Sequence, residues 1–192
     1  MMGSPGRFYL VETKLGWIGL VLSPGGPTGV RLRATTLPRA SRDDALREVA
    51  EMGATEPSSD AEAGDIARRV KALAEGEPAD IDGVIDWDSL PVRGISGFRR
   101  AVLEEALRIP RGETRSYGWL AARVGRPRAA RAVGRVMATN PLPIVVPCHR
   151  VIGSDGSLRG YGAGLWMKEA LLRAEGVRVG SVLNCRGETQ IP

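Results

Sequence analysis

Residues 144–151 have the sequence Ile144-Val145-Val146-Pro147-Cys148-His149-Arg150-Val151, which places the only histidine of the 192-residue chain beside one of its two cysteines. Only the thiolate form of cysteine is a good nucleophile, and a free thiol is mostly protonated at neutral pH. An imidazole within reach of the sulfur can accept its proton, and a carboxylate on the far side of the ring would fix the tautomer. The stretch therefore indicates an activated cysteine, with His149 as its base.

The apolar residues before the cysteine predict a short strand over 144–146 that leads into Pro147. Pro147 excludes a helix directly before the cysteine. Another interpretation of Cys148 stays open, because a buried cysteine is usually an inert small apolar residue. Neighbours on a strand also point to opposite faces. The His149 ring would therefore have to turn back toward the sulfur, with a water molecule between them.

Two short helices joined by a tight turn precede this stretch, over 117–124 and about 128–137, with Gly125-Arg126-Pro127 between them. This spacing is typical of a helix-turn-helix. The second helix has a face of small residues, which in a core would pack against another helix and on DNA would approach a groove closely. The basic character of this half favours DNA. The face comprises Ala129, Ala130, Ala132 and Gly134, with Arg128, Arg131 and Arg135 at its edges.

Charge is divided unevenly along the chain. Residues 1–90 hold 10 Lys or Arg against 15 Asp or Glu, a net charge of −5. Residues 91–192 hold 17 against 7, a net charge of +10. A solvated basic face is common by itself, but a division of this size favours a polyanion as the partner of the second half.

The remaining pattern predicts an α+β fold with two domains and a tail. Residues 1–90 are expected to form an N-terminal α/β domain with a small antiparallel sheet, and residues 91–180 a mainly helical domain with the helix-turn-helix; 181–192 would be a tail. Strands are expected over 7–12, 17–22 and 29–33. Further helices are expected over 41–52, from Ser58 or Ser59 to 75, over 96–108 and over 164–174, and a linker over 77–91.

Several classes of location and partner are disfavoured. No apolar run approaches the ~20 residues of a membrane helix, and no signal peptide follows the first residues. Two cysteines without such a signal predict a reducing compartment and no disulfide framework. We therefore expect an intracellular, cytoplasmic protein, nucleoid-associated in a prokaryote, that is monomeric and has no membrane partner.

The stretch Pro147-Cys148-His149-Arg150-Val151 resembles the active-site signature of the O6-alkylguanine-DNA alkyltransferases, also called methylated-DNA–protein-cysteine methyltransferases. The resemblance extends from about residue 97 to 176, with the elements of the family in order, whereas the N-terminal third is similar only in general character. The matching elements are Ser116-Tyr117, Ala129-Ala130-Arg131-Ala132-Val133-Gly134, Asn140-Pro141, Gly160-Tyr161, and Lys168 through Leu171-Leu172 to Glu175-Gly176.

The resemblance implies DNA repair by direct transfer of the alkyl group from O6-alkylguanine in double-stranded DNA to Cys148, and less well from O4-alkylthymine. The reaction would be irreversible, with a single turnover and no cofactor. His149 would act through a water molecule as the base toward Cys148, and Glu175 would accept the other imidazole proton. Without the resemblance, Glu175 would be interpreted as a surface carboxylate before the Gly176 cap.

The resemblance also implies that the damaged nucleotide leaves the duplex. Arg131 would fill the vacated space, with its helix in the minor groove. Tyr117 would rotate the nucleotide, although a tyrosine at a helix start is often a core residue. Asn140 would hold the turn before the active site, and Arg150 would be structural. The substrate pocket would consist of Tyr117, the Val151 carbonyl, Tyr161, Gly162 and backbone N–H groups of the loop 160–164.

Some features differ from the family pattern, and two other functions remain. Residues 1–90 contain no Cys or His, so the structural zinc of some members is not expected, and Ala163 stands where glycine is frequent. The first alternative is a non-catalytic sensor of alkylation lesions, which the presence of Cys148 disfavours. The second is a hydrolase with a Cys-His-Glu relay, which the basic half disfavours. No role is evident for Cys185.

Overall fold

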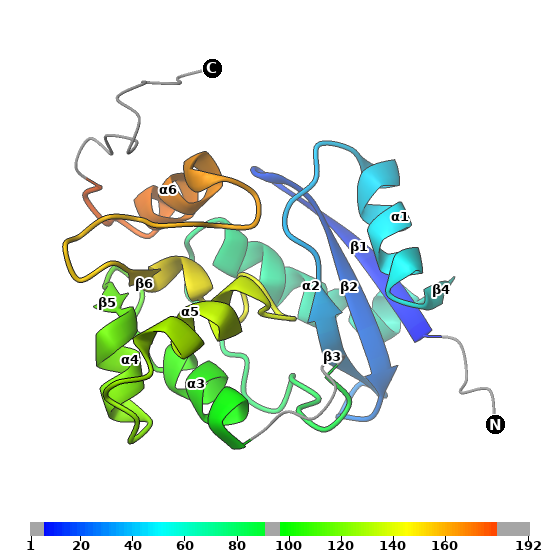
Figure 1. Ribbon diagram of the computed structural model, residues 1–192. Helices are drawn as coiled ribbons and strands as arrows, with labels where there is room; N and C mark the ends of the chain where they lie inside the picture. Colours follow the sequence, from blue (N-terminus) through cyan, green and yellow to red (C-terminus); the bar gives the residue numbers. More distant parts are fainter. Residues whose placement is uncertain (1–5, 91–96, 180–192) are drawn as a thin grey trace.

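The computed structural model describes residues 6–90 and 97–179, and a four-stranded sheet organises the first of these segments (Figure 1). The predicted antiparallel meander is confirmed, and a short fourth strand that the sequence did not predict adds in parallel beside β1, so the sheet is mixed. The fourth strand has one buried residue followed by three exposed ones, a pattern that gives no strand signal. The strands are β1 (Gly6–Thr13), β2 (Gly16–Pro24), β3 (Val30–Thr35) and β4 (Ala54–Pro57), in the order β3-β2-β1-β4.

Helices cover both faces of this sheet. Alternate residues of β2 point to opposite sides, so Leu20 joins the main core while Val21 joins a smaller cluster beneath α1 (Arg42–Glu51). The main core lies on the other face, against α2 (Asp60–Ala74) and the second half of the chain. This second half thus packs directly on the sheet that the first half builds (Figure 1).

Both N-terminal helices begin where the sequence predicts. The Ser41 side chain accepts a hydrogen bond from the Asp44 backbone and caps α1. Ser59 and Glu62 form a capping box at the start of α2. In the second half, α3 (Gly97–Leu107) matches its predicted helix, although Ser96 lies outside the described residues.

The predicted helix-turn-helix is present as α4 (Tyr117–Arg123) and α5 (Ala130–Ala138), which pack against each other. Ser116 caps α4 by accepting a hydrogen bond from the Trp119 backbone. Gly125 turns the chain with a φ of 72°, a conformation that glycine adopts without strain. The second helix begins two residues later than predicted, because a turn from Arg126 to Ala129 precedes it.

The predicted strand over 144–146 is wrong. The chain instead makes a turn in which Ile144 has a φ of 74° and the Val146 N–H donates to the Leu142 carbonyl at 2.7 Å. These apolar residues are buried as a compact turn, and apolar character by itself does not distinguish such a turn from a strand. A one-turn 3-10 helix η1 (Cys148–Arg150) follows, and then β6 (Val151–Ile152), which pairs in parallel with β5 (Arg115–Ser116).

The segment expected to be a linker is attached to the sheet over its described part. The Leu32 N–H donates to Val84 at 2.7 Å, and the Asp86 N–H donates back to Leu32 at 2.9 Å. Ile85 and Leu90 are buried in the main core, which contains residues of both halves. Residues 91–96 and the expected tail 181–192 lie outside the described residues, and the domain boundary after residue 90 stays a prediction. Within the described ranges, no helix is both long and apolar enough to cross a membrane.

Candidate active site

Cys148 lines a pocket of about 370 Å³ between the helix-turn-helix, the turn after α5 and the loop before α6 (Leu165–Ala174). The cysteine is 7% exposed, so the pocket is the route by which a ligand would reach its sulfur. Residues from five separate parts of the chain meet here. The lining residues are Leu37, Tyr117, Gly134, Met137, Ala138, Asn140, Pro143, Cys148, Gly160, Tyr161 and Gly162.

Asn140 fixes the turn that carries the cysteine. Its amide nitrogen donates to the Val146 carbonyl at 2.9 Å, and its amide oxygen accepts from the Leu142 N–H at 3.0 Å. Its side chain also forms a hydrogen bond with the Cys148 thiol, which lowers the pKa of that thiol. One side chain therefore holds both ends of the buried turn and contacts the sulfur.

Two of the three residues predicted for the relay are in direct contact, and Cys148 precedes His149 in the chain. The Nε2 atom of His149 lies 3.0 Å from Oε1 of Glu175, and both side chains are buried. An ionised carboxylate only accepts hydrogen bonds, so Nε2 carries the proton and Nδ1 keeps its lone pair. That Nδ1 atom is buried and has no hydrogen-bond partner among the residues described. The ring is thus oriented with a free basic nitrogen.

Arg150 is the third member of this buried cluster. The sequence predicts a structural role for it but not which residues it contacts. Its guanidinium contacts Glu175 with hydrogen bonds of 2.6, 3.0 and 3.1 Å, and its Nη1 donates to the Ile109 carbonyl at 2.7 Å. The expectation that Arg150 is structural fits these contacts. It also neutralises the carboxylate that orients His149, which the sequence did not predict.

Burial and hydrogen bonding set the charge states of these groups. Burial raises the pKa of the Cys148 thiol more than Asn140, Lys168 and Tyr161 lower it. Burial also lowers the pKa of His149, against the opposing effect of Glu175. Burial by itself would raise the pKa of Glu175, but hydrogen bonds from His149 and Arg150 outweigh it and lower the pKa to about 2. At neutral pH the thiol and imidazole are therefore neutral and the carboxylate is charged.

Lys168 is a site residue whose function sequence reasoning missed. It is 1% exposed, and its Nζ donates to the carbonyls of Val151 and Leu158, each at 2.6 Å. Burial lowers its pKa to about 8, while Cys148 acts in the opposite direction. The signal in the sequence is a lysine on the apolar face of α6, in helical register with Leu171. Lys168 thus connects α6 to β6 and to the loop that follows β6.

The predicted pocket residues do not all line the pocket. Tyr117, Tyr161 and Gly162 do, together with Cys148. Burial is the main cause that raises the pKa of both tyrosines above the ordinary value, so their hydroxyl groups stay protonated donors. Val151 is not among the residues that line the pocket. Its side chain is fully buried, and its carbonyl accepts a hydrogen bond from Lys168.

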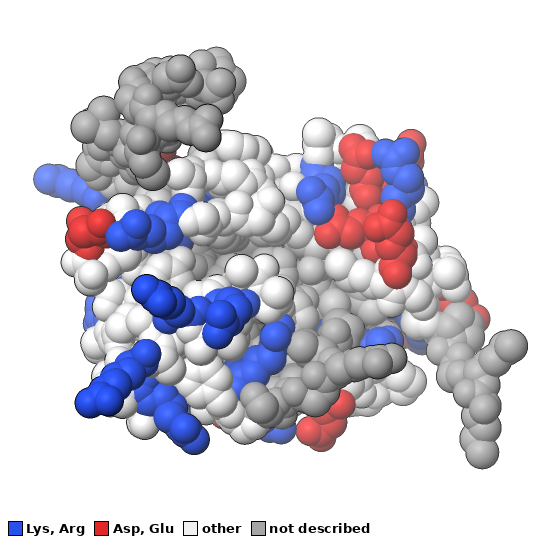
Figure 2. Space-filling view, viewed as in Figure 1, with Lys and Arg blue, Asp and Glu red and all other residues white. Residues whose placement is uncertain are grey.

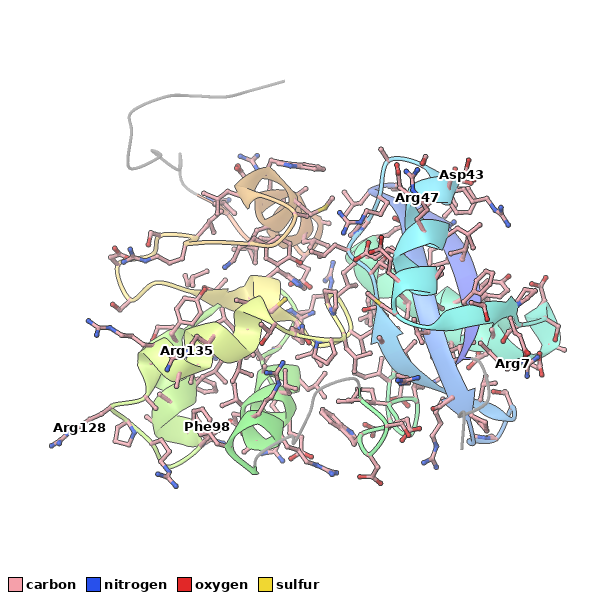
Figure 3. All side chains as sticks on the ribbon, turned by 45° about the vertical axis from the view of Figure 1, so that its right-hand side comes forward. Arg7, Asp43, Arg47, Phe98, Arg128 and Arg135 are labelled. Atoms are coloured by element: carbon pink, nitrogen blue, oxygen red, sulfur yellow. The ribbon has the colours of Figure 1, made fainter. Side chains whose placement is uncertain are left out.

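The outer face of α5 has the composition that the sequence predicts. Arg128, Arg131 and Arg135 are exposed and make no ion pair with any described residue, while the small residues between them are partly exposed. Basic side chains gather over α4 and α5, and acidic ones over α1 (Figure 2). Arg128 extends away from the body on the opposite side of the molecule from Asp43 and Arg47 (Figure 3). The inner face of α5 buries Val133, Val136 and Met137, and the small residues are Ala129, Ala130, Ala132 and Gly134.

The fold and the site place a buried cysteine beside a helix-turn-helix. Comparison with known proteins shows to which family this chain belongs. The family described as "6-O-methylguanine DNA methyltransferase, DNA binding domain" matches residues 97–177. A crystal structure of the Mycobacterium tuberculosis O6-methylguanine methyltransferase has a TM-score of 0.65 and 34% identity, covering 93% of this chain and 97% of that chain. The chain belongs to the O6-methylguanine-DNA methyltransferase family.

Other relatives agree with this assignment. The M. tuberculosis OGT in complex with DNA has a TM-score of 0.65 and 35% identity, covering 88% of this chain and 92% of that chain. The methylated-DNA–protein-cysteine methyltransferase of M. tuberculosis strain H37Rv is 47% identical over 107 residues, which are 56% of this chain and 61% of that protein. The protein of the same name from Salmonella typhimurium is 54% identical over 83 residues, 43% of this chain and 48% of that protein. The matched region thus spans about half to three fifths of these curated relatives.

Proposed function

We propose that this protein repairs double-stranded DNA by transferring the alkyl group of O6-alkylguanine to Cys148. The observation that carries the proposal is that Cys148 lines a pocket beside α5, while the next two residues, His149 and Arg150, form a buried cluster with Glu175. The match of residues 97–177 to the DNA-binding domain of the family supports the same reaction.

In the proposed reaction, the sulfur of Cys148 attacks the alkyl carbon, a carbon–sulfur bond forms, and the bond between that carbon and guanine O6 breaks. The thiol proton passes through a water molecule to Nδ1 of His149, the buried nitrogen with a free lone pair, and finally protonates the departing guanine. The Glu175 carboxylate stabilises the transient imidazolium. A thioether is stable, so the protein would be consumed after one turnover.

The pocket accommodates a single base, so the damaged nucleotide would have to leave the duplex. The exposed arginines of α5 would contact phosphates, and its small residues would allow close approach in the minor groove. Arg131 would occupy the space that the nucleotide leaves. Tyr117 and Tyr161, whose hydroxyls stay protonated, would donate hydrogen bonds as negative charge develops on the leaving guanine.

The test is the intact mass of the protein after mixing with excess duplex that carries one O6-methylguanine. We expect a gain of one methyl group that stops at one equivalent and maps to Cys148. Cys148→Ala should gain nothing and still bind the duplex, while Cys185→Ser should behave as the wild type.

Two outcomes would contradict the proposal. Tight binding to the lesion without any mass change would assign the protein to the non-catalytic lesion sensors. Turnover beyond one equivalent would exclude a suicide reaction and favour a hydrolytic cysteine relay.

A further inference from the structure

We infer that the N-terminal half selects which alkyl groups react, because Leu37 forms the wall of the pocket that does not come from the family's DNA-binding domain. This inference rests on the proposed function and specifies its substrates. Leu37 lies in the connection between β3 and α1, and it lines the same pocket as Cys148. The family match covers only residues 97–177, so this wall is outside it.

Two hydrogen bonds hold this connection against one side of the pocket. The Thr35 N–H donates to the Pro141 carbonyl at 3.0 Å, and its hydroxyl donates to the Pro143 carbonyl at 2.9 Å. Thr35 is 2% exposed, so these bonds are shielded from water. Pro143 also lines the pocket. The last residue of β3 therefore fixes the distance between the sheet and the turn that precedes the cysteine.

Leu37 itself lies against the loop that carries Gly162. A Cβ atom built on Gly162 would lie 3.0 Å from Cδ1 of Leu37 and within 4 Å of no other described residue beyond its chain neighbours. Gly162 belongs to the loop before α6 and lines the pocket. The side chain of Leu37 thus lies beside this loop, and there is no free room between them for an additional methyl group.

These contacts limit the room for the substituent on O6. A methyl group needs only the space next to the Cys148 sulfur, whereas a benzyl group needs additional apolar volume in the same pocket. Thr35 of the N-terminal half forms hydrogen bonds with the turn at 141–143, and Leu37 lies against the loop at 160–162, so both of these pocket walls contact that half. The size of the side chain at position 37 therefore sets the additional volume.

The test compares single-turnover rate constants on two duplexes of one sequence, one with O6-methylguanine and one with O6-benzylguanine. We expect Leu37→Ala to raise the benzyl-to-methyl rate ratio by about tenfold, and Leu37→Phe to lower it by a similar factor. Leu46→Ala is the matched control, because Leu46 is also a half-buried leucine of the N-terminal half but lies on α1 and packs against the smaller core cluster, not the pocket. It should leave the ratio unchanged.

A double-mutant cycle tests the contact itself. Gly162→Ala should lower the benzyl-to-methyl ratio by pressing on Leu37, and adding Leu37→Ala should restore it. The inference is overturned if the Leu37 variants keep the wild-type ratio, if Leu46→Ala changes it equally, or if the two substitutions act independently. If the wild-type protein gained no alkyl group from either duplex, the proposed function would fail and this inference with it.

Discussion

The guanidinium of Arg150 holds the carboxylate of Glu175 with three hydrogen bonds of 2.6 to 3.1 Å, and that same carboxylate contacts Nε2 of His149. Three consecutive residues, Cys148, His149 and Arg150, therefore supply the proposed nucleophile, its proposed base and a cation that lowers the pKa of the carboxylate. A single turn of 3-10 helix presents all three. The carboxylate lies just beyond the end of α6, so the relay depends on how this helix is docked.

Glu175→Gln should destabilise the protein by about 3 kcal/mol at pH 7, because it leaves the charge of Arg150 buried and unpaired. The pKa of Glu175 is about 2 in the folded protein, below its ordinary value of 4.5. On acidification the unfolded state binds the proton first, so this stabilisation is complete above pH 4.5 and is lost as the pH falls through about 2. Urea denaturation of both proteins at several pH values measures the difference.

Glu169→Gln is the control for this experiment, because Glu169 pairs with Arg173 on the exposed side of the same helix. A change below about 1 kcal/mol is expected there. An equal loss in both variants, or a loss in Glu175→Gln that persists unchanged at pH 2, would contradict the role given to the buried carboxylate.

Arg131→Ala should slow the reaction with O6-methylguanine in duplex about tenfold, equivalent to about 1.4 kcal/mol, and leave the reaction with free O6-benzylguanine unchanged. In the proposed reaction, only the duplex substrate would require a side chain to fill the space of the displaced nucleotide. Rates at saturating substrate measure this effect. Arg128→Ala, close to the start of the same helix, should instead weaken the binding of duplexes of every sequence. It should also reduce by about 1 the slope of log binding constant against log salt concentration. Equal losses on both substrates would exclude a flipping role for Arg131.

Gly76→Ala should destabilise the protein by about 3 kcal/mol or more, because the added Cβ would lie 2.2 Å from the Ala174 carbonyl oxygen, next to Glu175. Gly83→Ala is the matched control: its φ of 71° resembles the 79° of Gly76, but nothing described lies within 4 Å of its Cβ. Chemical denaturation of the two variants separates the steric effect from backbone strain. Similar losses in both would show that the close approach to α6 is unimportant.

Lys168→Met should cost about 3 kcal/mol, because it removes the donor to two buried carbonyl groups, those of Val151 and Leu158. The apolar methionine keeps most of the volume, so the loss reports the hydrogen bonds rather than a cavity. Arg173→Met, on the exposed side of α6, should change stability by less than about 1 kcal/mol. A stable Lys168→Met protein would show that the loop from β6 to α6 is held by other contacts.

Local patterns in the sequence determined much of this protein. Ser41 and Ser59 fixed helix starts because a cap acts on neighbouring N–H groups, and apolar periodicity located α2 and α3. The tight turn containing Gly125 indicated the pair α4 and α5. The adjacency of Cys148 and His149 predicted the proposed chemistry, because both residues lie in one short segment. The face of α5 that carries arginines was likewise visible as a helical repeat.

Tertiary structure alone decided the features that depend on distant segments. The strand β4 and the short pair β5–β6 have too few residues to show a period, and the turn before Cys148 packs on Thr35 of the sheet. Arg150 and Lys168 gain their partners from elements far along the chain. Leu37 reaches the pocket only because β3 docks on the turn after α5. The longest of these contacts, from Thr35 to Pro143, joins residues 108 positions apart, and no local pattern encodes which of many possible pairings the packed core selects.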